Sequence, residues 1–361
     1  GFGLASQFYF GKPLNQLNVT EIASLVAIVK GPSIYNPRKY PQKLKARRNM
    51  VLKTMVKNGI IKDHSFEFGL DQKILVADKI LSRSKDAEAF IDLVKIHLKD
   101  EYSENVLETG GLNIHTTFDL FLQKSIRDTL SNTLSRLGER FPLSKNAQAA
   151  VVVIKPQTGE LQAIIGDVVK GNGKFNRAVY SKRQIGSMIK PFIYSMALDT
   201  PENFTLLTEI NDANIAWELS DGSKWEPSNY NDEINGRVTL IDGLVRSLNL
   251  ATVDLGSKLG VEKVVNYLEK IGFPLAIAPF PSVLLGAIEL TPLQLTSLYT
   301  TFVNAGYKLP IKTIKSVRDQ NNYLVRQYPA ELMPSLSPQT AALIQYALIQ
   351  VARNGTAKAI A

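Results

Sequence analysis

Apolar residues recur along much of the chain at the three-to-four residue spacing of helices. Near the N-terminus this spacing predicts a helix from Glu21 to Lys30, with Thr20 as its cap, and another that begins at Pro41 and ends at Gly59. Residues 1–66 are therefore predicted to be all-α. The same spacing, with the residues that begin and end helices, predicts further helices over 89–99, 119–138, 187–198, 250–259, 291–306 and 337–355.

Shorter apolar runs predict strands, which become more frequent after residue 140. They lie at 112–117, 149–154, 161–165, 311–318 and 323–328, with polar turns at 156–159, 221–222 and 319–322. Two of these turns join neighbouring runs into predicted hairpins, the first with buried strands. Residues 140–361 are predicted to form an α+β domain with an antiparallel sheet and a helical cluster. Residues 67–139, with a polar linker at 82–88, are predicted to form a connector and the start of that domain.

The composition is that of a globular protein with two or three domains, because 361 residues contain 45% apolar and 21% charged positions. The absence of cysteine excludes disulfides and thiol chemistry. His64, His97 and His115 lack the spacing of metal ligands, so no metal site is expected. No apolar stretch approaches the roughly 20 residues that span a bilayer. We therefore expect any membrane anchor to lie outside this sequence.

Positive charge is concentrated in one segment. Between Arg38 and Lys62 there are nine basic residues and no acidic one, a surplus as large as the net charge of +9. Such a segment favours a polyanion or an anionic membrane surface, although a solvated basic helix face explains most charge runs. Only Tyr40 is interleaved with these charges, which disfavours nucleic-acid binding because base stacking needs several aromatic side chains.

The strongest candidate for chemistry is Ser187, at the predicted start of a buried helix. Lys190 lies three residues later, on the same helix face, with Cβ atoms roughly 5–6 Å apart. Burial disfavours the charged ammonium, so this lysine can be neutral enough to take the serine proton. Gly186 leaves room for a carbonyl substrate, and the helix N-terminus offers N–H groups to an oxyanion. The plain alternative is an N-cap serine beside a surface-reaching lysine.

Both short motifs of this candidate site occur more than once. Ser82–Lys85 repeats the S-x-x-K spacing, but it lies in a charged stretch and is predicted to be a loop. S-x-N occurs at Ser103–Asn105 and Ser144–Asn146 in polar surroundings. Only Ser247–Asn249 lies between two predicted helices, the first opened by the capping box Thr239–Asp242. An ordinary turn between helices is the alternative there, as it is for Gly171–Lys174, which lacks the spacing of a phosphate-binding loop.

Three runs together resemble the transpeptidase domain of class A, bifunctional penicillin-binding proteins, and in particular their 1B branch: 183–191, 246–256 and 284–292. The resemblance implies a serine acyltransferase that cross-links peptidoglycan stem peptides, without a cofactor, and that β-lactams acylate. It implies Ser187 as the nucleophile, Lys190 as its base, Ser247 as a proton relay and Asn249 as a substrate ligand.

The N-terminal segment resembles the C-terminal part of the peptidoglycan glycosyltransferase domain that precedes the transpeptidase in this family. The similar runs are 4–6, 9–12, 30–37 and 47–52. They imply a lysozyme-like all-α fold that polymerises a lipid-linked disaccharide precursor, with Arg47 and Arg48 binding substrate and a divalent cation as a candidate cofactor. They also imply the periplasmic face of a bacterial inner membrane and an outer-membrane activator as a partner. The catalytic glutamates are expected upstream of residue 1.

One departure from the family pattern is the absence of a K-T-G motif. Lys53–Thr54 and Lys312–Thr313 lack the glycine, and 351–356 resembles the segment that precedes this motif, so we expect the sequence to stop before it. Two other classes remain open. A β-lactamase or D,D-carboxypeptidase would not carry the glycosyltransferase-like segment, whereas a β-lactam sensor would acylate without turning over stem peptides.

Overall fold

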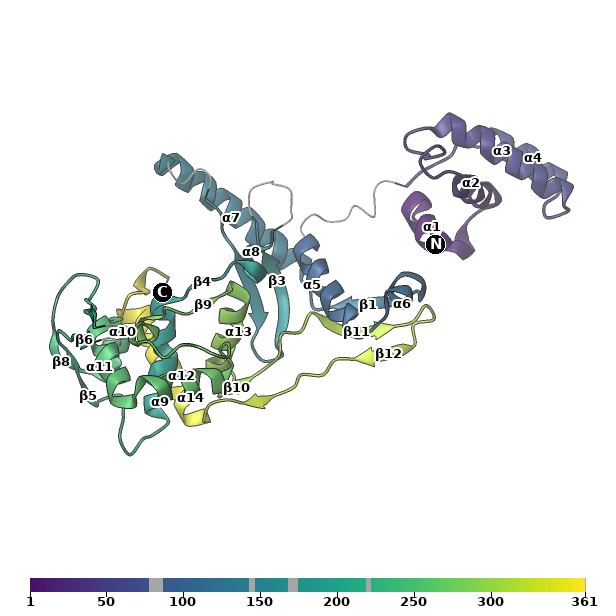
Figure 1. Ribbon diagram of the computed structural model, residues 1–361. Helices are drawn as coiled ribbons and strands as arrows, with labels where there is room; N and C mark the ends of the chain where they lie inside the picture. Colours follow the sequence, from purple (N-terminus) through teal and green to yellow (C-terminus); the bar gives the residue numbers. More distant parts are fainter. Residues whose placement is uncertain (78–86, 143–146, 168–174, 219–221, 361) are drawn as a thin grey trace. The chain divides into compact units, whose positions relative to one another are not determined.

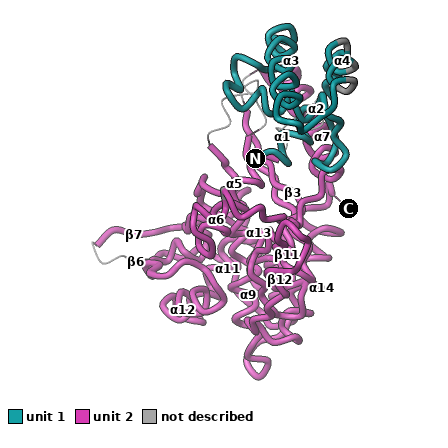
Figure 2. Tube along the Cα trace, turned by 90° about the vertical axis from the view of Figure 1, so that its right-hand side faces the viewer, with its two compact units in different colours: residues 1–84 teal, residues 85–361 magenta. Residues whose placement is uncertain are grey.

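The chain divides into two compact units, Gly1–Ser84 and Lys85–Ala361 (Figure 2). The computed structural model describes residues 1–360 except 78–86, 143–146, 168–174 and 219–221. The predicted loops at Ser82–Lys85 and Gly171–Lys174, and the S-x-N copy at Ser144–Asn146, lie outside the described residues. Within the described part, no helix is long and apolar enough to cross a membrane.

The first unit is helical, as predicted. Its core consists of apolar side chains from three helices, among them Phe10, Ile28 and Leu44. Its elements are α1 (Phe2–Phe10), the 3-10 helix η1 (Leu14–Gln16), α2 (Val19–Val29), α3 (Pro41–Lys57) and α4 (Asp63–Asp71).

The predicted cap of α2 is wrong. Asn18, not Thr20, caps the helix: its side chain accepts from the Glu21 N–H, and the Glu21 carboxylate accepts from the Asn18 N–H, each at 2.9 Å. Asn18 has the extended backbone that an N-cap requires, whereas Thr20 already lies within the first turn.

The first unit extends beyond the predicted boundary at residue 66, because two of its arginines bind backbone carbonyls that follow this boundary. Arg48 donates to the carbonyl oxygen of Gln72 at 2.8 Å, and Arg38 donates to that of Ala77 at 3.0 Å. The Ala77 N–H in turn donates to the Tyr9 carbonyl at 2.8 Å. Residues up to Ala77 therefore pack on the first unit, and the predicted boundary falls inside it.

The second unit mixes helices and short strands (Figure 1). Its helices are α5 (Glu88–Lys99), α6 (Glu104–Thr109), α7 (Leu120–Arg140), α8 (Arg177–Tyr180), η4 (Gly186–Ile189), α9 (Lys190–Leu198), α10 (Leu240–Val245), α11 (Asn249–Leu259), α12 (Val261–Ile271), η5 (Pro281–Leu285), α13 (Pro292–Val303), α14 (Pro338–Asn354) and η6 (Lys358–Ile360). Its strands are β1 (Asn113–Thr116), β2 (Val151–Lys155), β3 (Glu160–Ile165), β4 (Arg183–Gln184), β5 (Glu209–Asp212), β6 (Trp217–Glu218), β7 (Lys224–Trp225), β8 (Gly236–Thr239), β9 (Glu289–Leu290), β10 (Tyr307–Lys308), β11 (Ile314–Arg318), β12 (Leu324–Gln327) and β13 (Met333–Pro334).

The predicted hairpins β2–β3 and β11–β12 are confirmed, and both are antiparallel. The described strands are divided among several small sheets, the largest with the order β1-β11-β12. β3 is mostly buried, but β2 is only half-buried, which corrects the prediction of two buried strands. Part of the predicted connector is integral to the second unit, because β1 pairs with β11 and α5 packs in one apolar cluster with β3 and β11.

Helix α9 lies in the helical part of the second unit, in contact with α10, α11, α12 and α14 (Figure 1). Its side chains are buried on all faces, from Phe192 and Ile193 to Ala197. Fully burying a large apolar side chain contributes about 1.5–3 kcal/mol, so α9 is held firmly in this core. The helix therefore provides a rigid support for residues at its N-terminal end.

Candidate active site

The backbone that precedes Ser187 is held by a strand pairing and by a close contact between two glycines. β4 pairs with β9, and the Ile185 N–H donates to the Ile288 carbonyl at 3.0 Å. The Gly186 N–H then donates to the Gly286 carbonyl at 3.2 Å. Ser187 follows in η4, which continues into α9 with Pro191 in the first turn, as predicted.

We expect Gly286→Ala to disturb this approach. Gly286 has a φ of +81°, and a Cβ there would stand 2.1 Å from the Gly186 carbonyl oxygen. The left-handed backbone alone costs an alanine roughly 1–2 kcal/mol, and the overlap with the Gly186 backbone adds to this. We predict a loss of at least ~2 kcal/mol of unfolding free energy and slower modification of Ser187, measured by thermal melting and by labelling with an acylating agent.

Gly222→Ala is the matched control for this prediction. Gly222 also has a positive φ, of +80°, but nothing lies within 4 Å of its added Cβ. This control variant should lose only the unfolding free energy that a left-handed backbone costs an alanine, roughly 1–2 kcal/mol. Equal losses in the two variants would show that the contact between Gly186 and Gly286 does not hold the serine in place.

Ser187, Ser247 and Asn249 line one cavity of about 460 Å³. Ser187 comes from η4, while Ser247 and Asn249 come from the loop between α10 and α11 and the start of α11. The structure therefore brings together predicted residues that are distant in the sequence. Ser103, from a different S-x-N copy, instead precedes α6. Other residues that line the cavity are Asn229, Tyr230, Asn231, Arg246, Leu248 and Thr356.

Lys190 is almost completely buried and donates three hydrogen bonds through Nζ. Its acceptors are the Ser247 carbonyl at 2.6 Å, Asn249 Oδ1 at 2.8 Å and Ser247 Oγ at 3.2 Å. These partners account for the three protons of an ammonium group. The direct contact to Ser187 that helical spacing suggested is not among the hydrogen bonds of the described residues. The long lysine side chain reaches the neighbouring loop instead.

Burial lowers the pKa of Lys190 to about 7, although the carboxylate of Asp212 acts in the opposite direction. A lysine with this pKa is divided between its charged and neutral forms near neutral pH. Its neutral form can accept a proton, and Ser247 Oγ lies within hydrogen-bonding distance to pass one on. The arrangement can therefore activate a serine hydroxyl that faces the same cavity.

Ser247 has a strained backbone, with a φ of +55°. A residue with a side chain pays roughly 1–2 kcal/mol in this left-handed region, and such residues cluster at functional sites. The conformation presents both the carbonyl and the hydroxyl of Ser247 to Lys190. The strained backbone of Ser247 therefore gives Lys190 two of its three hydrogen-bond acceptors.

Sequence analysis missed Asp212 and Asn229, two buried polar residues beside this loop. Asn229 Nδ2 donates to both carboxylate oxygens of Asp212, at 2.9 and 3.0 Å. Their positions depend on packing between distant segments. The one local signal was Leu248, an apolar residue at an N-cap position, which implies that α11 takes its cap from elsewhere.

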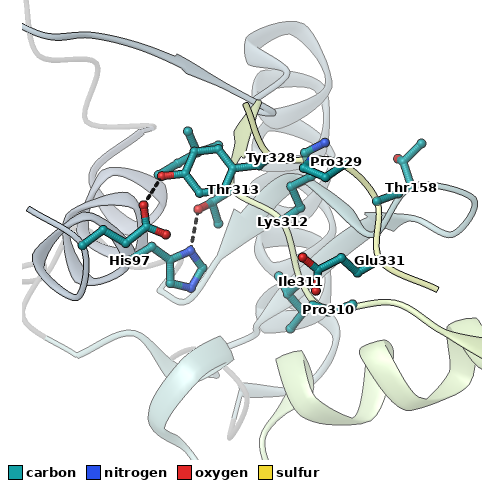
Figure 3. Close-up of a pocket in the computed structure, with 12 residues that line it drawn as sticks. His97, Thr158, Pro310, Ile311, Lys312, Thr313, Tyr328, Pro329 and Glu331 are labelled. Carbon is teal, nitrogen blue, oxygen red and sulfur yellow. Dashed lines mark hydrogen bonds between the residues drawn. The ribbon is translucent and has the colours of Figure 1, made fainter. Parts of the chain in front are cut away.

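A second cavity of about 190 Å³ lies elsewhere in the same unit and shares no lining residue with the first (Figure 3). His97 Nδ1 bonds to the Thr313 hydroxyl at 2.8 Å, and the Tyr328 hydroxyl donates to Glu101. These groups satisfy one another and link α5 to the segments around β11 and β12. Lys312 and Thr313 line this cavity, so the lysine-threonine pair lies apart from Ser187.

Two family models match the chain. The penicillin binding protein transpeptidase domain matches residues 149–361, and the transglycosylase matches residues 1–56. The chain belongs to the penicillin-binding protein transpeptidase family. The cavity residues Ser187, Ser247 and Asn249 all lie within the matched transpeptidase segment.

Similar proteins place this penicillin-binding protein chain in class A, on the 1B side. Penicillin-binding protein 1B of Vibrio cholerae serotype O1 is 35% identical over 360 residues, which are 99% of this chain and 46% of that protein. The Escherichia coli K12 protein of the same name is 33% identical over 361 residues, 99% of this chain and 42% of that protein. The chain therefore spans less than half the length of these two relatives.

Solved structures of penicillin-binding proteins share the fold. Penicillin-binding protein 1A from Haemophilus influenzae aligns with a TM-score of 0.78 at 21% identity, over 100% of this chain and 72% of that chain. Penicillin-binding protein A from M. tuberculosis, in an imipenem acyl-enzyme complex, aligns with a TM-score of 0.56 at 19% identity, over 75% and 72% of the two chains. Together with the two family models, the first of these likenesses confirms the predicted fold, a helical transglycosylase segment followed by an α+β transpeptidase domain.

The two arginines of the transglycosylase segment of this penicillin-binding protein differ in their surroundings. Arg48 is fully buried, and its guanidinium donates to Asn49 and to the carbonyls of Leu70 and Gln72. These contacts favour a structural role over the predicted direct binding of substrate. Arg47 is half-buried, and its Nε lacks a hydrogen-bond partner. Among the described residues no group of three His, Asp or Glu could hold a metal ion.

Proposed function

We propose that this protein cross-links peptidoglycan as a serine D-Ala-D-Ala transpeptidase, and that the protein to which the chain belongs also polymerises glycan strands. The observation that carries the first activity is the cavity shared by Ser187, Ser247 and Asn249, with Lys190 bonded to the latter two. The family membership supports the same reaction class. The transglycosylase match at residues 1–56 argues against a simple β-lactamase or carboxypeptidase.

In the acylation step, Ser187 Oγ attacks the carbonyl carbon of the penultimate D-Ala residue of a donor stem peptide. The serine proton passes to neutral Lys190, directly or through Ser247 Oγ, which lies 3.2 Å from Nζ. The C–N bond then breaks, and the terminal D-Ala leaves as an amine after receiving this proton. Asn249, which lines the same cavity as Ser187, is the candidate ligand for the amide backbone of the peptide.

In the second step, the amino group of an acceptor stem peptide attacks the acyl-serine. Lys190 removes a proton from this amine and returns it to Ser187 Oγ as the acyl C–O bond breaks, which restores the serine hydroxyl. β-Lactams enter the same sequence, because their ring carbonyl acylates the serine. They then block the site, because the leaving amine stays attached to the acyl group.

The glycosyltransferase part of the proposal concerns the first unit. Arg47 is the candidate ligand for the pyrophosphate of a lipid-linked disaccharide precursor, because this arginine is only partly buried, whereas Arg48 is fully buried. Arg48 would hold the segment 70–72 in place behind it. The proposal locates the protein in the bacterial cell envelope, at the periplasmic face of the inner membrane. An outer-membrane activator is a further proposed partner.

The test is cross-linking by the full-length protein from lipid-linked precursor, followed by analysis of the digested product. We expect dimeric stem peptides in the product, their loss when penicillin is present, and a penicillin adduct that maps to Ser187. Rapid acylation without turnover of stem peptides would instead identify a β-lactam sensor. Release of D-Ala without cross-links would identify a carboxypeptidase.

A further inference from the structure

Asp212, the last residue of β5, carries a fully buried carboxylate. Besides its two contacts with Asn229, it accepts from the Asn235 N–H at 3.0 Å, from Asn235 Nδ2 at 2.6 Å and from the Ala251 N–H at 3.3 Å. Burial alone would raise the pKa of Asp212, but these hydrogen bonds outweigh it and hold the pKa below its usual value. The carboxylate is therefore ionised at neutral pH.

The N-terminus of α11 is capped by side chains from outside the helix. Leu248, which precedes it, offers no acceptor. Asn229 Oδ1 instead accepts from the N–H groups of Asn249 at 2.7 Å and Leu250 at 3.3 Å, while Asp212 takes that of Ala251. The first N–H groups of a helix have no partner within it, and a negative charge is favoured there. Asp212 and Asn229 together supply the hydrogen-bond acceptors and the negative charge that stabilise the N-terminus of α11.

Asn249 connects this cap to Lys190. Its N–H donates to Asn229, its Nδ2 donates to the Ser228 carbonyl at 2.8 Å, and its Oδ1 accepts from Lys190. The side chain of Asn249 is therefore held at both ends. A displaced α11 N-terminus would move Asn249 and the preceding Ser247 relative to Lys190.

We propose that Asp212 is a positioning residue for acyl transfer, which acts through Asn229 and the N-terminus of α11 to hold Ser247 and Asn249 against Lys190. Its buried negative charge is a second contribution, since it favours the charged form of the lysine that accepts the proton. This inference rests on the proposed function of Ser187. It adds a role for residues that do not touch the reacting atoms.

The negative charge of Asp212 raises the pKa of Lys190. Burial has the larger effect and lowers this pKa to about 7. Other ionisable side chains on the packed elements have nearer partners: Asp254 with Lys258, Arg246 with Asn235, and Tyr194 with Thr252. Removing the Asp212 charge should therefore lower the pKa of Lys190 further.

The test compares two variants in the full-length protein, with the rate of Ser187 acylation by a fluorescent penicillin followed from about pH 5 to about pH 9. Asp212→Asn should move the midpoint of the pH profile down by roughly one unit, because it removes an opposite charge. Its maximal rate should fall ~10- to 100-fold through misplacement of the α11 N-terminus. Asn229→Ala keeps the charge of Asp212. It should therefore lower the maximal acylation rate without moving the midpoint of the pH profile.

Asp254→Asn is the matched control, since it neutralises a carboxylate on α11 that is paired with Lys258 at 2.7 Å. The amide oxygen of the variant still offers an acceptor to the Asn211 N–H, which Asp254 binds at 2.9 Å. It should keep the parent rate and midpoint. An unshifted midpoint in Asp212→Asn overturns the role of its charge, and an unchanged maximal rate in Asn229→Ala overturns the positioning role. If Asp212→Asn fails to fold, as judged by thermal melting, Asn229→Ala still decides the positioning role. A parent protein that is not acylated at Ser187 would overturn the proposed function itself.

Discussion

The Ser187→Ala variant should lose covalent labelling by a fluorescent penicillin completely. No other atom can replace the serine oxygen in the acyl bond, whereas a missing base or relay only slows the reaction. The fold should persist, because Ser187 is exposed at the edge of the cavity and exposed substitutions usually change stability by less than ~0.5 kcal/mol. Labelling intensity on a gel and a thermal melt measure the two expectations.

Ser82→Ala provides the control, because it alters the other S-x-x-K copy in the sequence and should label like the parent. Mass spectrometry of the acylated parent protein gives a second, direct readout. An adduct found on a serine other than Ser187 would refute the assignment of the nucleophile.

Replacement of Lys190 should have the second-largest effect. Lys190→Arg should lose acylation nearly as badly as Lys190→Ala, because guanidinium keeps its charge and cannot accept the serine proton. General-base catalysis contributes ~10²–10⁴-fold, which sets the expected loss in the acylation rate. Lys190→Met serves as a control of similar length that fills the buried space without a base. Retention of most of the rate by arginine would reduce the lysine to an electrostatic support.

The pH dependence of the parent protein follows from the same residue. Acylation should rise as the pH passes through about 7, because the neutral amine accumulates above the folded-state pKa of Lys190. Between about 7 and 10.5, the ordinary pKa of a lysine, only the unfolded chain keeps this proton, so the contribution of Lys190 to stability should increase with pH there. Lys190→Met should abolish both trends, and melts in matched buffers would show it.

The local elements of this protein were predictable because neighbouring residues determine them. Asp119, Thr291 and Ser337 cap α7, α13 and α14 as the sequence indicated, and the turn at 319–322 joins its hairpin. Capping and periodicity depend on contacts across a few positions. The cap of α2 was assigned wrongly although Asn18 and Glu21 carry the signal, since Thr20 is also a common cap type.

The candidate site was predictable only in part. S-x-x-K occurs at two places and S-x-N at three. An apolar helix behind Ser187 and two helices around Ser247 were enough to select the copies whose serines the structure places at one cavity. Arg48 shows the limit of this approach. A basic residue in a basic segment suggested a ligand for phosphate, but its guanidinium is used to bind buried carbonyl oxygens.

Local patterns in the sequence predicted most of the long helices, though not α12, and both hairpins, the family resemblance and the candidate serine and lysine. Only the tertiary structure decided that Lys190 bonds to the loop of Ser247 and Asn249, and that Asp212 and Asn229 cap α11. The physical reason is the range of the interactions involved. Spacing and caps act along one segment, whereas a buried charge or amide finds its partners only after distant segments have packed around a common core.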